Sequence, residues 1–448
     1  MKDRIFWFKN YLFRRYAFNK YKEALHYEHL SVEELKALNW EKRKNIVEYA
    51  YFHTPFYKKY YDSRGFHPSQ IYSDKDWEKV PILEKEFVRE NPEALKSDEF
   101  DWNSLSPSTT GGSTGTPLIV YKEKKIPFEV MGWRALNWWG LDPSDNVGIL
   151  HRRTPTSFVG NLKNRLLWWP TQRAYLNATK ISNKNIIDFI KEIKRRKIVW
   201  IQGYCSALEQ VSDFICDNNI YIPNVKMVWS TSSPLSKTVR VKIETAFHCQ
   251  VMDQYGCCEL WNIAMQKPNE PYLTICSDFV HVDVVRDDGS VCGKEEYGDI
   301  LITDLNTFGF PLIKYRLGDK GSISLTALES HDRFPKLNFV KGRITDSIYL
   351  QNNDRIDGAY LTTICDKYPE IIDSFQIYQK LDFSVQLKLV LKKDVSPENP
   401  SIQNIINRLR EKLGDSIPFS YIILDEIKGD RGKKRYIISE IALERQKH

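Results

Sequence analysis

The stretch NIIDFIKEIKRRKIVWIQGYCSALEQVSDFI, residues 185–215, decides the fold class. Its first part repeats isoleucine at helical spacing, at Ile186, Ile187, Ile190 and Ile193. The apolar run IVWIQGY, residues 198–204, predicts a short buried strand, and residues 206–218 then return to a helical pattern. Helices that alternate with short apolar strands are typical of an α/β sheet whose strand ends carry loops.

The alternation continues towards the C-terminus. VKMVWSTSS (225–233) predicts a strand, residues 236–247 a helix, and CQVMDQYG (249–256) another strand. The section from 280 to 325 is strand-rich, with a turn signal at Asp287-Asp288-Gly289. In the N-terminal part, Ser31-Val-Glu-Glu34 is a capping-box signature that predicts a helix ending near Tyr51.

A change of texture near residue 341 predicts a second domain. Strands FQIYQK and VQLKLVLKK, a helix over 401–413 and strand SYIILDEI form a βαβ-like set. We therefore predict an α/β protein with two domains. The large N-terminal domain, 1–340, has mixed sheets and helices and begins with a mainly helical entry segment, 1–100. The small α+β C-terminal domain, 341–448, is expected to be a mobile lid.

The composition is that of a globular protein without a nucleic-acid-binding surface. Of the 448 residues, 42% are hydrophobic and 27% are charged, and the net charge is +7. Residues 1–22 carry seven Lys/Arg against one Asp, so the rest of the chain is close to neutral. A generally basic surface for nucleic acid is therefore unsupported, and no apolar run is long enough to predict a membrane span.

The N-terminal segment MKDRIFWFKNYLFRRYAFNKYK is basic and aromatic and lacks the apolar core of a secretory signal. We expect a cytoplasmic protein, and its eight cysteines, which include no CxxC pair, are expected to be reduced. Two interpretations of the segment stay open. Its apolar side chains Phe6, Trp7, Tyr11 and Leu12 pack on the body, or the helix lies on the inner face of an anionic membrane as a peripheral contact.

The loop TTGGSTGTP, residues 109–117, combines three glycines with five hydroxyl side chains. Backbone amides and hydroxyls in such a loop form a concavity suited to phosphate groups. The spacing is not that of a Walker loop, because no lysine directly follows Gly115. By itself the loop indicates a phosphate cradle without a local cation.

Further motifs follow this loop in a fixed order: STSSPL (230–235), DQYGCCEL (253–260), YGDILITDL…PLIKYRLGD, KGRITDSI and RGKKRYIIS. The series resembles the adenylate-forming superfamily of acyl-CoA synthetases and adenylation domains. Within it the chain is similar to the phenylacetate-CoA ligase branch, particularly the CapK-like proteins of polysaccharide loci. EYAYFHTPFYKKYYD, VPILEKEFVREN and GYCSAL also resemble that branch, and the similarity spans roughly residues 40 to 440.

The resemblance implies roles for named residues. The loop would grip the β- and γ-phosphates of ATP through Thr109, Thr110, Gly111, Gly112, Ser113, Thr114, Gly115 and Thr116. Tyr255 would lie against adenine, Gly256 would permit close approach, and Glu259 would hold Mg²⁺ between phosphate oxygens. Asp319 would accept the ribose hydroxyls.

The remaining implied residues lie nearer the C-terminus or depart from the family pattern. Cys258 stands where the family has Thr or Ser against the α-phosphate, and a thiol is a weaker donor. Ser232 and Ser233 fall in the adenine-contacting loop, and Arg343 resembles the domain-junction arginine. The hinge is assigned only to 343–346. Lys433 matches the catalytic lysine that bridges the acyl carboxylate and the α-phosphate, with Lys434 as the competing assignment.

The chemistry implied is ATP-dependent activation of a small-molecule or saccharide carboxylate as an acyl-adenylate, with release of pyrophosphate. Mg²⁺ and ATP are the expected cofactors, and coenzyme A, an amine or a sugar hydroxyl is the expected acceptor. The CapK-like resemblance suggests a role in surface polysaccharide biosynthesis, which fold-level analogy does not establish. Two alternatives stay open: a catalytically degenerate nucleotide-binding scaffold at a membrane-associated polysaccharide assembly, and an adenylyltransferase.

Two weaker hypotheses concern residues outside this series. A structural zinc site would draw on zinc-type ligands close together in sequence: Cys249, Cys257, Cys258, Cys276 and His281. No pair has finger-like spacing, and buried cysteines are common. The acid pocket would take its aromatic side chains from Trp133, Trp138, Trp139 and Tyr204, although aromatics at such spacing are more often core.

Overall fold

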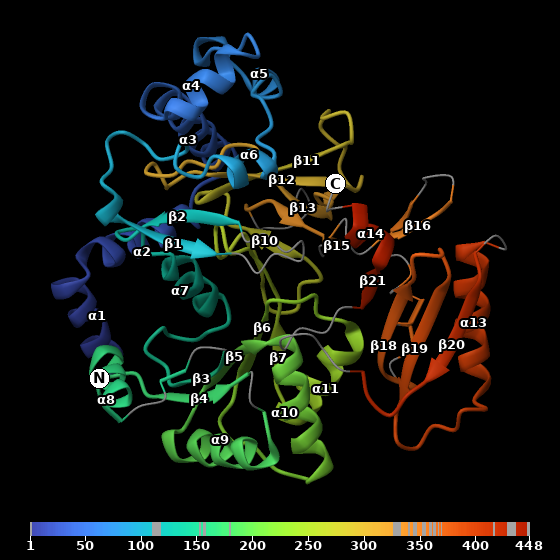
Figure 1. The fold of residues 1–448 in the computed structure, drawn as a ribbon. Helices are drawn as coiled ribbons and strands as arrows, with labels where there is room; N and C mark the ends of the chain where they lie inside the picture. The colour runs from blue at the N-terminus through green and yellow to red at the C-terminus, as the bar shows by residue number, and fades with distance from the viewer. Residues whose placement is uncertain are drawn as a thin grey trace. The chain divides into compact units, whose positions relative to one another are not determined.

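The computed structural model describes residues 2–109, 118–151, 154–155, 158–178, 181–325, 333–338, 341–343, 347–351, 355–357, 361, 364–365, 367–368, 370–414, 417–427 and 436–445 (Figure 1). These residues form two compact units. The first contains Asp3–Pro143 and Gln254–Val340, and the second contains Lys2, Ser144–Asp253 and Lys341–His448. None of the described helices is both long enough and apolar enough to cross a bilayer.

The second unit contains a parallel five-stranded sheet in the order β4-β3-β5-β6-β7. Its strands are β3 (Val147–His151), β4 (Arg173–Asn177), β5 (Trp200–Tyr204), β6 (Met227–Thr231) and β7 (Gln250–Met252). Its helices are α8 (Phe158–Trp168), α9 (Asn183–Arg196), α10 (Cys205–Asp217) and α11 (Lys237–Phe247), and α9 to α11 lie along the sheet in Figure 1. Ser182 and Ser236 cap α9 and α11 by accepting backbone N–H bonds. The predicted α/β class is confirmed.

One predicted strand is wrong. CQVMDQYG does not form a single strand, because its two halves pair with different partners. β7 runs parallel to β6, whereas β8 (Gln254–Tyr255) runs antiparallel to β9 (Ala264–Gln266). The break at Asp253 is also the boundary between the two units, which no local pattern of hydrophobicity reveals.

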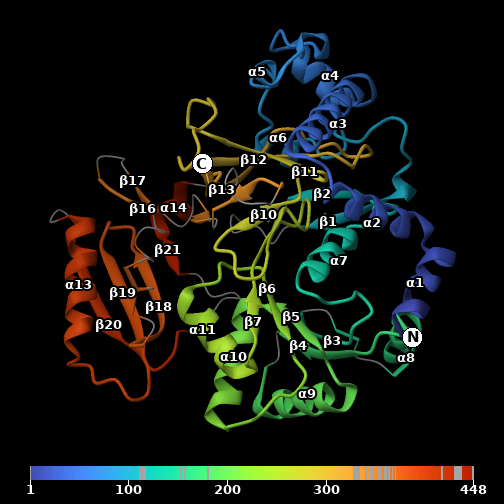
Figure 2. The same ribbon diagram turned by 180° about the vertical axis from the view of Figure 1, so that it is seen from behind.

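The last hundred residues contribute a second sheet, with strand order β20-β19-β18-β21. Its elements are β18 (Ile372–Gln379), β19 (Val385–Leu391), α13 (Pro400–Leu413), β20 (Phe419–Ile423), β21 (Ile437–Ser439) and α14 (Glu440–Arg445), with the small pair β16 (Ser347–Tyr349) and β17 (Arg355–Asp357). β19 and β20 are parallel and joined through α13, which is the predicted βαβ-like connection. Figures 1 and 2 both show α13 along this sheet.

The first unit begins with helices and continues into three small antiparallel sheets. The helices are α1 (Lys2–Phe13), α2 (Arg15–Tyr27), α3 (Val32–His53), α4 (Pro55–Asp62), η1 (Pro68–Gln70), α5 (Asp74–Trp77), α6 (Lys85–Glu90), η2 (Trp102–Ser104) and α7 (Glu129–Trp138). The strands are β1 (Leu105–Thr109), β2 (Ile119–Glu123), β8, β9, β10 (Leu273–Ile275), β11 (Val280–Val285), β12 (Gly298–Asp304), β13 (Tyr315–Gly321) and β14 (Lys336–Leu337), and β15 (Lys341–Arg343) follows them. The predicted capping box at Ser31 and Glu34 is present at the start of α3.

In the N-terminal segment, some of the apolar side chains pack on the body of the protein and others are exposed. Phe6 is buried, and Trp7 stacks on Tyr21, with both side chains against Trp133 of α7. Tyr11 and Leu12, which the packing interpretation also placed on the body, are exposed. The packing interpretation is therefore wrong for these two residues, because they lie on the face of α1 opposite the buried Phe6.

A buried ion pair stabilises the base of α7 in this unit. Arg134 and Asp278 both have fully buried side chains and share two hydrogen bonds, at 2.7 and 3.0 Å. The neighbouring carboxylate raises the pKa of Arg134, overcoming the opposing effect of burial. Lys42 of α3 donates to the Asp278 carbonyl, so the same turn is held by both helices.

Candidate active site

The glycine-rich loop is carried by a two-stranded hairpin. β1 and β2 pair antiparallel, with Thr109 opposite Ile119 at the end next to the loop. Residues 110–117, which include Thr110, Gly111, Gly112, Ser113, Thr114, Gly115 and Thr116, lie outside the described residues. At the end of β1, Ser108 Oγ donates to the Cys258 carbonyl at 3.2 Å. The hairpin of the loop is thereby joined to the DQYGCCEL motif.

Tyr255 and Asp319 lie together although 64 residues separate them. The Tyr255 hydroxyl donates to Asp319 Oδ2 at 3.0 Å, from β8 to β13. Burial raises the pKa of the Tyr255 phenol well above its ordinary value, and Asp319 raises it further, so the hydroxyl stays protonated and donates. The two residues that the resemblance assigns to adenine and ribose therefore belong to one hydrogen-bonded pair.

Gly256 allows the motif to fold back tightly on itself. A Cβ on Gly256 would lie 1.6 Å from the Trp261 carbonyl oxygen, a distance that no side chain can occupy. Trp261 has a positive φ of 70°, which costs energy for a residue with a bulky side chain. The sequence predicts close approach at Gly256, and the approaching group in this structure is the chain's own backbone.

Glu259 is buried, and two other elements hold its carboxylate. The Tyr315 hydroxyl donates to Glu259 Oε1 at 3.2 Å, and Lys85 Nζ of α6 lies 3.6 Å from the same oxygen. Burial raises the pKa of Tyr315, with Glu259 as a further cause, so that the phenol remains a donor. Both contacts fall on one oxygen, and a fixed carboxylate of this kind is suited to hold a divalent cation.

Lys122, on β2, places a second cation beside the motif. The residue is only 5% exposed, and its Nζ has no hydrogen-bond acceptor among the described residues. The ammonium lies 4.6 Å from the centroid of the Trp261 ring and 5.0 Å from that of Phe128, and these two rings stack on each other. Burial lowers the pKa of Lys122 to about 8.

The two cysteines of the motif differ in environment. Cys258, in place of the family hydroxyl, is exposed, and its carbonyl is the acceptor for Ser108. Cys257 Sγ accepts the Leu260 backbone N–H at 3.3 Å, and burial raises the pKa of its thiol well above the usual range. Cys257 therefore acts as an uncharged part of the turn.

The other predicted site residues lie in the second unit or outside the described residues. Ser232 and Ser233 follow the carboxyl end of β6, where Ser232 adopts a positive φ of 76°. Strand ends of parallel sheets are the usual place for ligand-binding loops. Arg343 ends β15. Lys433, Lys434 and the hinge residues Thr345 and Asp346 lie outside the described residues.

The zinc and acid-pocket hypotheses receive no support from the described residues. Among them, the one group of three or more ligand-type side chains whose atoms lie within reach of one another is Glu209, Asp213 and Asp373, and it contains no Cys or His. Trp133 is core, Trp138 donates to Glu28, and Trp139 donates to the Gln266 carbonyl. Tyr204 stacks on His151 at the end of β5. A cavity of about 380 Å³ includes Trp138 but none of the motif residues.

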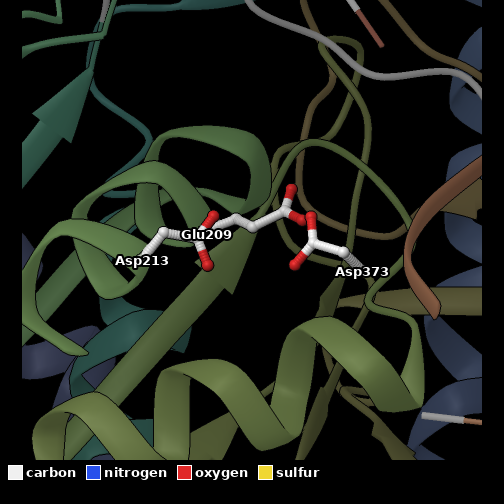
Figure 3. A group of neighbouring side chains, drawn as sticks. All are labelled: Glu209, Asp213 and Asp373. Atoms are coloured by element: carbon white, nitrogen blue, oxygen red, sulfur yellow. The ribbon is translucent and has the colours of Figure 1, made fainter. Parts of the chain in front are cut away.

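The carboxylate cluster already has a cation of its own. Figure 3 shows Glu209 and Asp213 of α10 facing Asp373 of β18. Lys242 Nζ lies 3.3 Å from both Glu209 and Asp213 and also contacts Asp373. These carboxylates raise the pKa of Lys242 to about 12 against the opposing effect of burial. The cluster is therefore an ion-pair network inside the second unit.

Sequence reasoning missed Lys85, Lys122, Tyr315 and Ser108. Lys85 and Tyr315 both occur in segments that carry the family resemblance, VPILEKEFVREN and PLIKYRLGD. Their location in these motifs could have marked them as candidate site residues. Lys122 follows the glycine-rich loop on β2 and resembles any surface lysine until its burial is known.

Comparison with known proteins finds sequence relatives of the predicted kind. A sequence-family profile described as the CapK C-terminal domain matches residues 348–440. Protein CapK of Staphylococcus aureus is 22% identical over 385 residues, which cover 81% of this chain and 80% of that protein. The phenylacetate-coenzyme A ligase of Escherichia coli (strain K12) is 24% identical over 310 residues, covering 65% of this chain and 68% of the ligase.

A solved structure shares the fold. A crystal structure of 2-hydroxyisobutyryl-CoA ligase in the postadenylation state, in complex with 2-HIB-AMP, matches with a TM-score of 0.75 at 16% identity. The match covers 93% of this chain and 92% of that one, so it extends over both the sheets and the C-terminal elements. The predicted resemblance is therefore confirmed: the chain is similar in sequence to CapK and to the phenylacetate-coenzyme A ligases, and it shares the fold of an adenylate-forming CoA ligase.

Proposed function

We propose that the protein activates a carboxylic acid as an acyl-adenylate at the expense of ATP and then transfers the acyl group to an acceptor. The observation that carries this proposal is the joining of the loop hairpin to the DQYGCCEL turn through Ser108 and Cys258. The same turn holds Glu259 in place and pairs Tyr255 with Asp319. In this proposal the hairpin that carries the loop would serve the phosphates, Glu259 would hold the metal ion, and Tyr255 with Asp319 would contact the nucleoside; the contacts among these described residues support it.

The residues present fit Mg·ATP. Glu259 is a buried carboxylate whose contacts with Tyr315 and Lys85 both fall on Oε1. Its other oxygen, Oε2, is the one that would ligate the metal ion. Lys122 supplies a buried ammonium without a hydrogen-bond acceptor among the described residues, as an anion site requires. Mg²⁺, when bound, would neutralise charge on the phosphates. Asp319 is a carboxylate acceptor suited to hydroxyl groups such as those of ribose.

The proposed reaction has two steps, adenylation and acyl transfer. In the first, a carboxylate oxygen of the substrate attacks the α-phosphorus of ATP, and the bond to pyrophosphate breaks. In the second, a nucleophile attacks the acyl carbon and AMP leaves. Lys433 would lie between the two anions of the first step, where a cation reduces their repulsion. Lys434 is the competing assignment.

The substrate and acceptor are proposed more broadly. We propose a small-molecule or saccharide carboxylate as substrate, and coenzyme A, an amine or a sugar hydroxyl as acceptor. A role in surface polysaccharide biosynthesis is supported by the name of the S. aureus relative alone.

The direct test is product analysis. The protein is incubated with Mg·ATP and a panel of acids, and we expect AMP and pyrophosphate to be formed. Lys433→Ala should abolish both, whereas Lys380→Ala, at an exposed lysine of the same region, should leave them unchanged. ADP as product would refute adenylate formation. ATP binding without turnover on any acid would favour the scaffold alternative, and AMP retained on the substrate would favour an adenylyltransferase.

We propose that the C-terminal domain, 341–448, alternates between two positions about the stretch 343–346, because one site must serve two half-reactions. Thr345→Pro would restrict this stretch. We expect pyrophosphate formation and acyl transfer to be impaired to different extents, measured as isotope exchange and as AMP release with acceptor. Equal loss of both half-reactions would count against alternation.

We also propose that residues 1–22 contact the inner surface of an anionic membrane from the cytoplasm. The large apolar and aromatic side chains exposed on this segment are Phe8, Tyr11, Leu12, Phe13 and Tyr16. Phe8 and Phe13 are 63% and 78% exposed, and Arg4, Arg15 and Lys22 are exposed in the same segment. Exposed aromatics beside basic residues suit an interface that is both apolar and anionic.

Vesicle flotation tests this contact. Wild type should float with vesicles containing phosphatidylglycerol and much less with phosphatidylcholine alone. Phe8→Ser with Phe13→Ser should abolish flotation, whereas Tyr72→Ser, at another exposed aromatic, should not. Equal flotation of the double variant and wild type would refute a role for this segment.

A further inference from the structure

A buried ammonium beside the motif turn is not used by any of the roles that the family resemblance assigns. Lys122 lies on β2, in the hairpin that carries the glycine-rich loop, opposite Ser106 of β1. Its Nζ is in contact range of Trp261, the residue that closes the turn after Glu259. Lys122 is therefore connected by structure to both phosphate-associated segments.

This buried ammonium lacks the hydrogen-bond acceptors that a buried cation normally has. Burying a cation is costly unless it is paired or hydrogen-bonded, and Lys122 has no hydrogen-bond acceptor among the described residues. Stacking over the Phe128 and Trp261 rings offsets part of the cost without satisfying the three N–H donors. The titratable groups near Lys122 are the thiols Cys257 and Cys258 and the carboxyl groups of Glu259 and Asp304, of which Cys257 is uncharged, and none accepts a hydrogen bond from the ammonium.

Whereas Lys122 is a donor without an acceptor, position 258 lacks a donor for the phosphate. There the chain lacks the hydroxyl that the family pattern places against the α-phosphate, and a thiol is a poor replacement. A lysine side chain on the neighbouring hairpin supplies a stronger, charge-assisted donor. Its long stem allows the ammonium to leave the aromatic rings for an anion close by.

We propose that Lys122 is a phosphate-binding residue, which donates to an oxygen of the nucleotide's phosphates and compensates for the missing hydroxyl at Cys258. This inference rests on the proposed function. The ligand class is a nucleoside triphosphate with its divalent cation. Lys122 reaches the nucleotide from β2, the strand that follows the loop.

Isothermal titration of Mg·ATP tests it with three variants. Lys122→Met should weaken binding roughly ten- to a hundredfold, the range expected for one hydrogen bond to a charged group. Lys122→Arg should recover most of the affinity. The control Lys125→Met, at an exposed lysine three residues along, should bind as wild type does.

The pH dependence gives a second measurement. Wild-type affinity should fall as pH rises from 7 to 9, as the ammonium of the free protein loses its proton, and Lys122→Met should lose this dependence. Equal Mg·ATP affinity for Lys122→Met and Lys125→Met, with wild type binding, would overturn the inference alone. Absence of binding by wild type would overturn the proposed function, and the inference with it.

Discussion

Replacing Lys122 by methionine should make the ligand-free protein more stable at pH 7. Burial holds the pKa of Lys122 at about 8 instead of the ordinary 10.5. This difference corresponds to about 3 kcal/mol of unfavourable free energy for keeping the ammonium charged in the folded state. Because the cation–π contacts with Phe128 and Trp261 recover part of that amount, we expect a net gain of roughly 1 to 3 kcal/mol in Lys122→Met. Methionine keeps the unbranched stem and its packing.

The sign of the pH dependence follows from the same pKa. Below pH 8 the lysine is protonated in both folded and unfolded chains, so the whole cost of burial is present. Between pH 8 and 10.5 the folded chain loses this proton while the unfolded chain retains it, and the cost disappears. The stability advantage of Lys122→Met over wild type should therefore be greatest near pH 7 and vanish towards pH 10.5.

The assay is denaturant unfolding of both proteins at pH 7, 8, 9 and 10, with the free energy of unfolding extrapolated to water. Lys125→Met is the control, since its exposed ammonium carries no such cost. A Lys122→Met variant less stable than wild type at pH 7, or curves that stay parallel from pH 7 to 10, would refute the reasoning. Greater stability combined with weaker Mg·ATP binding would identify Lys122 as a residue kept for its ligand.

Three further predictions concern the same unit. Arg134→Met should lower the free energy of unfolding by about 3 to 5 kcal/mol because it leaves a buried carboxylate unpaired, and adding Asp278→Leu should restore most of the loss in chemical denaturation. Gly256→Ala should abolish pyrophosphate release and lower the melting temperature, since its Cβ would overlap a backbone oxygen, whereas Gly293→Ala should change neither. Glu259→Gln should reduce pyrophosphate release roughly a hundredfold, which is the typical effect of removing one preorganised charged group, and should leave the melting temperature unchanged. Retained activity would exclude Glu259 as the metal ligand.

Local chemistry in the sequence determined the elements and the family. Ser31 starts its helix where its capping-box pattern predicts it, because a cap depends only on the residues that follow it. The order of short motifs was sufficient to indicate the adenylate-forming fold. It also singled out Tyr255, Glu259 and Asp319, whose side chains the structure brings into hydrogen-bonded pairs within the first unit.

The tertiary structure decided what depends on distant partners. CQVMDQYG is predicted as one strand from its sequence but contributes to two sheets, since strand pairing is set by neighbours from elsewhere in the chain. Lys85 contacts Glu259 from 174 residues away, and the ammonium of the buried Lys122 lies against the rings of Phe128 and Trp261. The type of residue at each position is local information. Its burial, and therefore its pKa and the ligand it can hold, is decided by the packing of the whole unit.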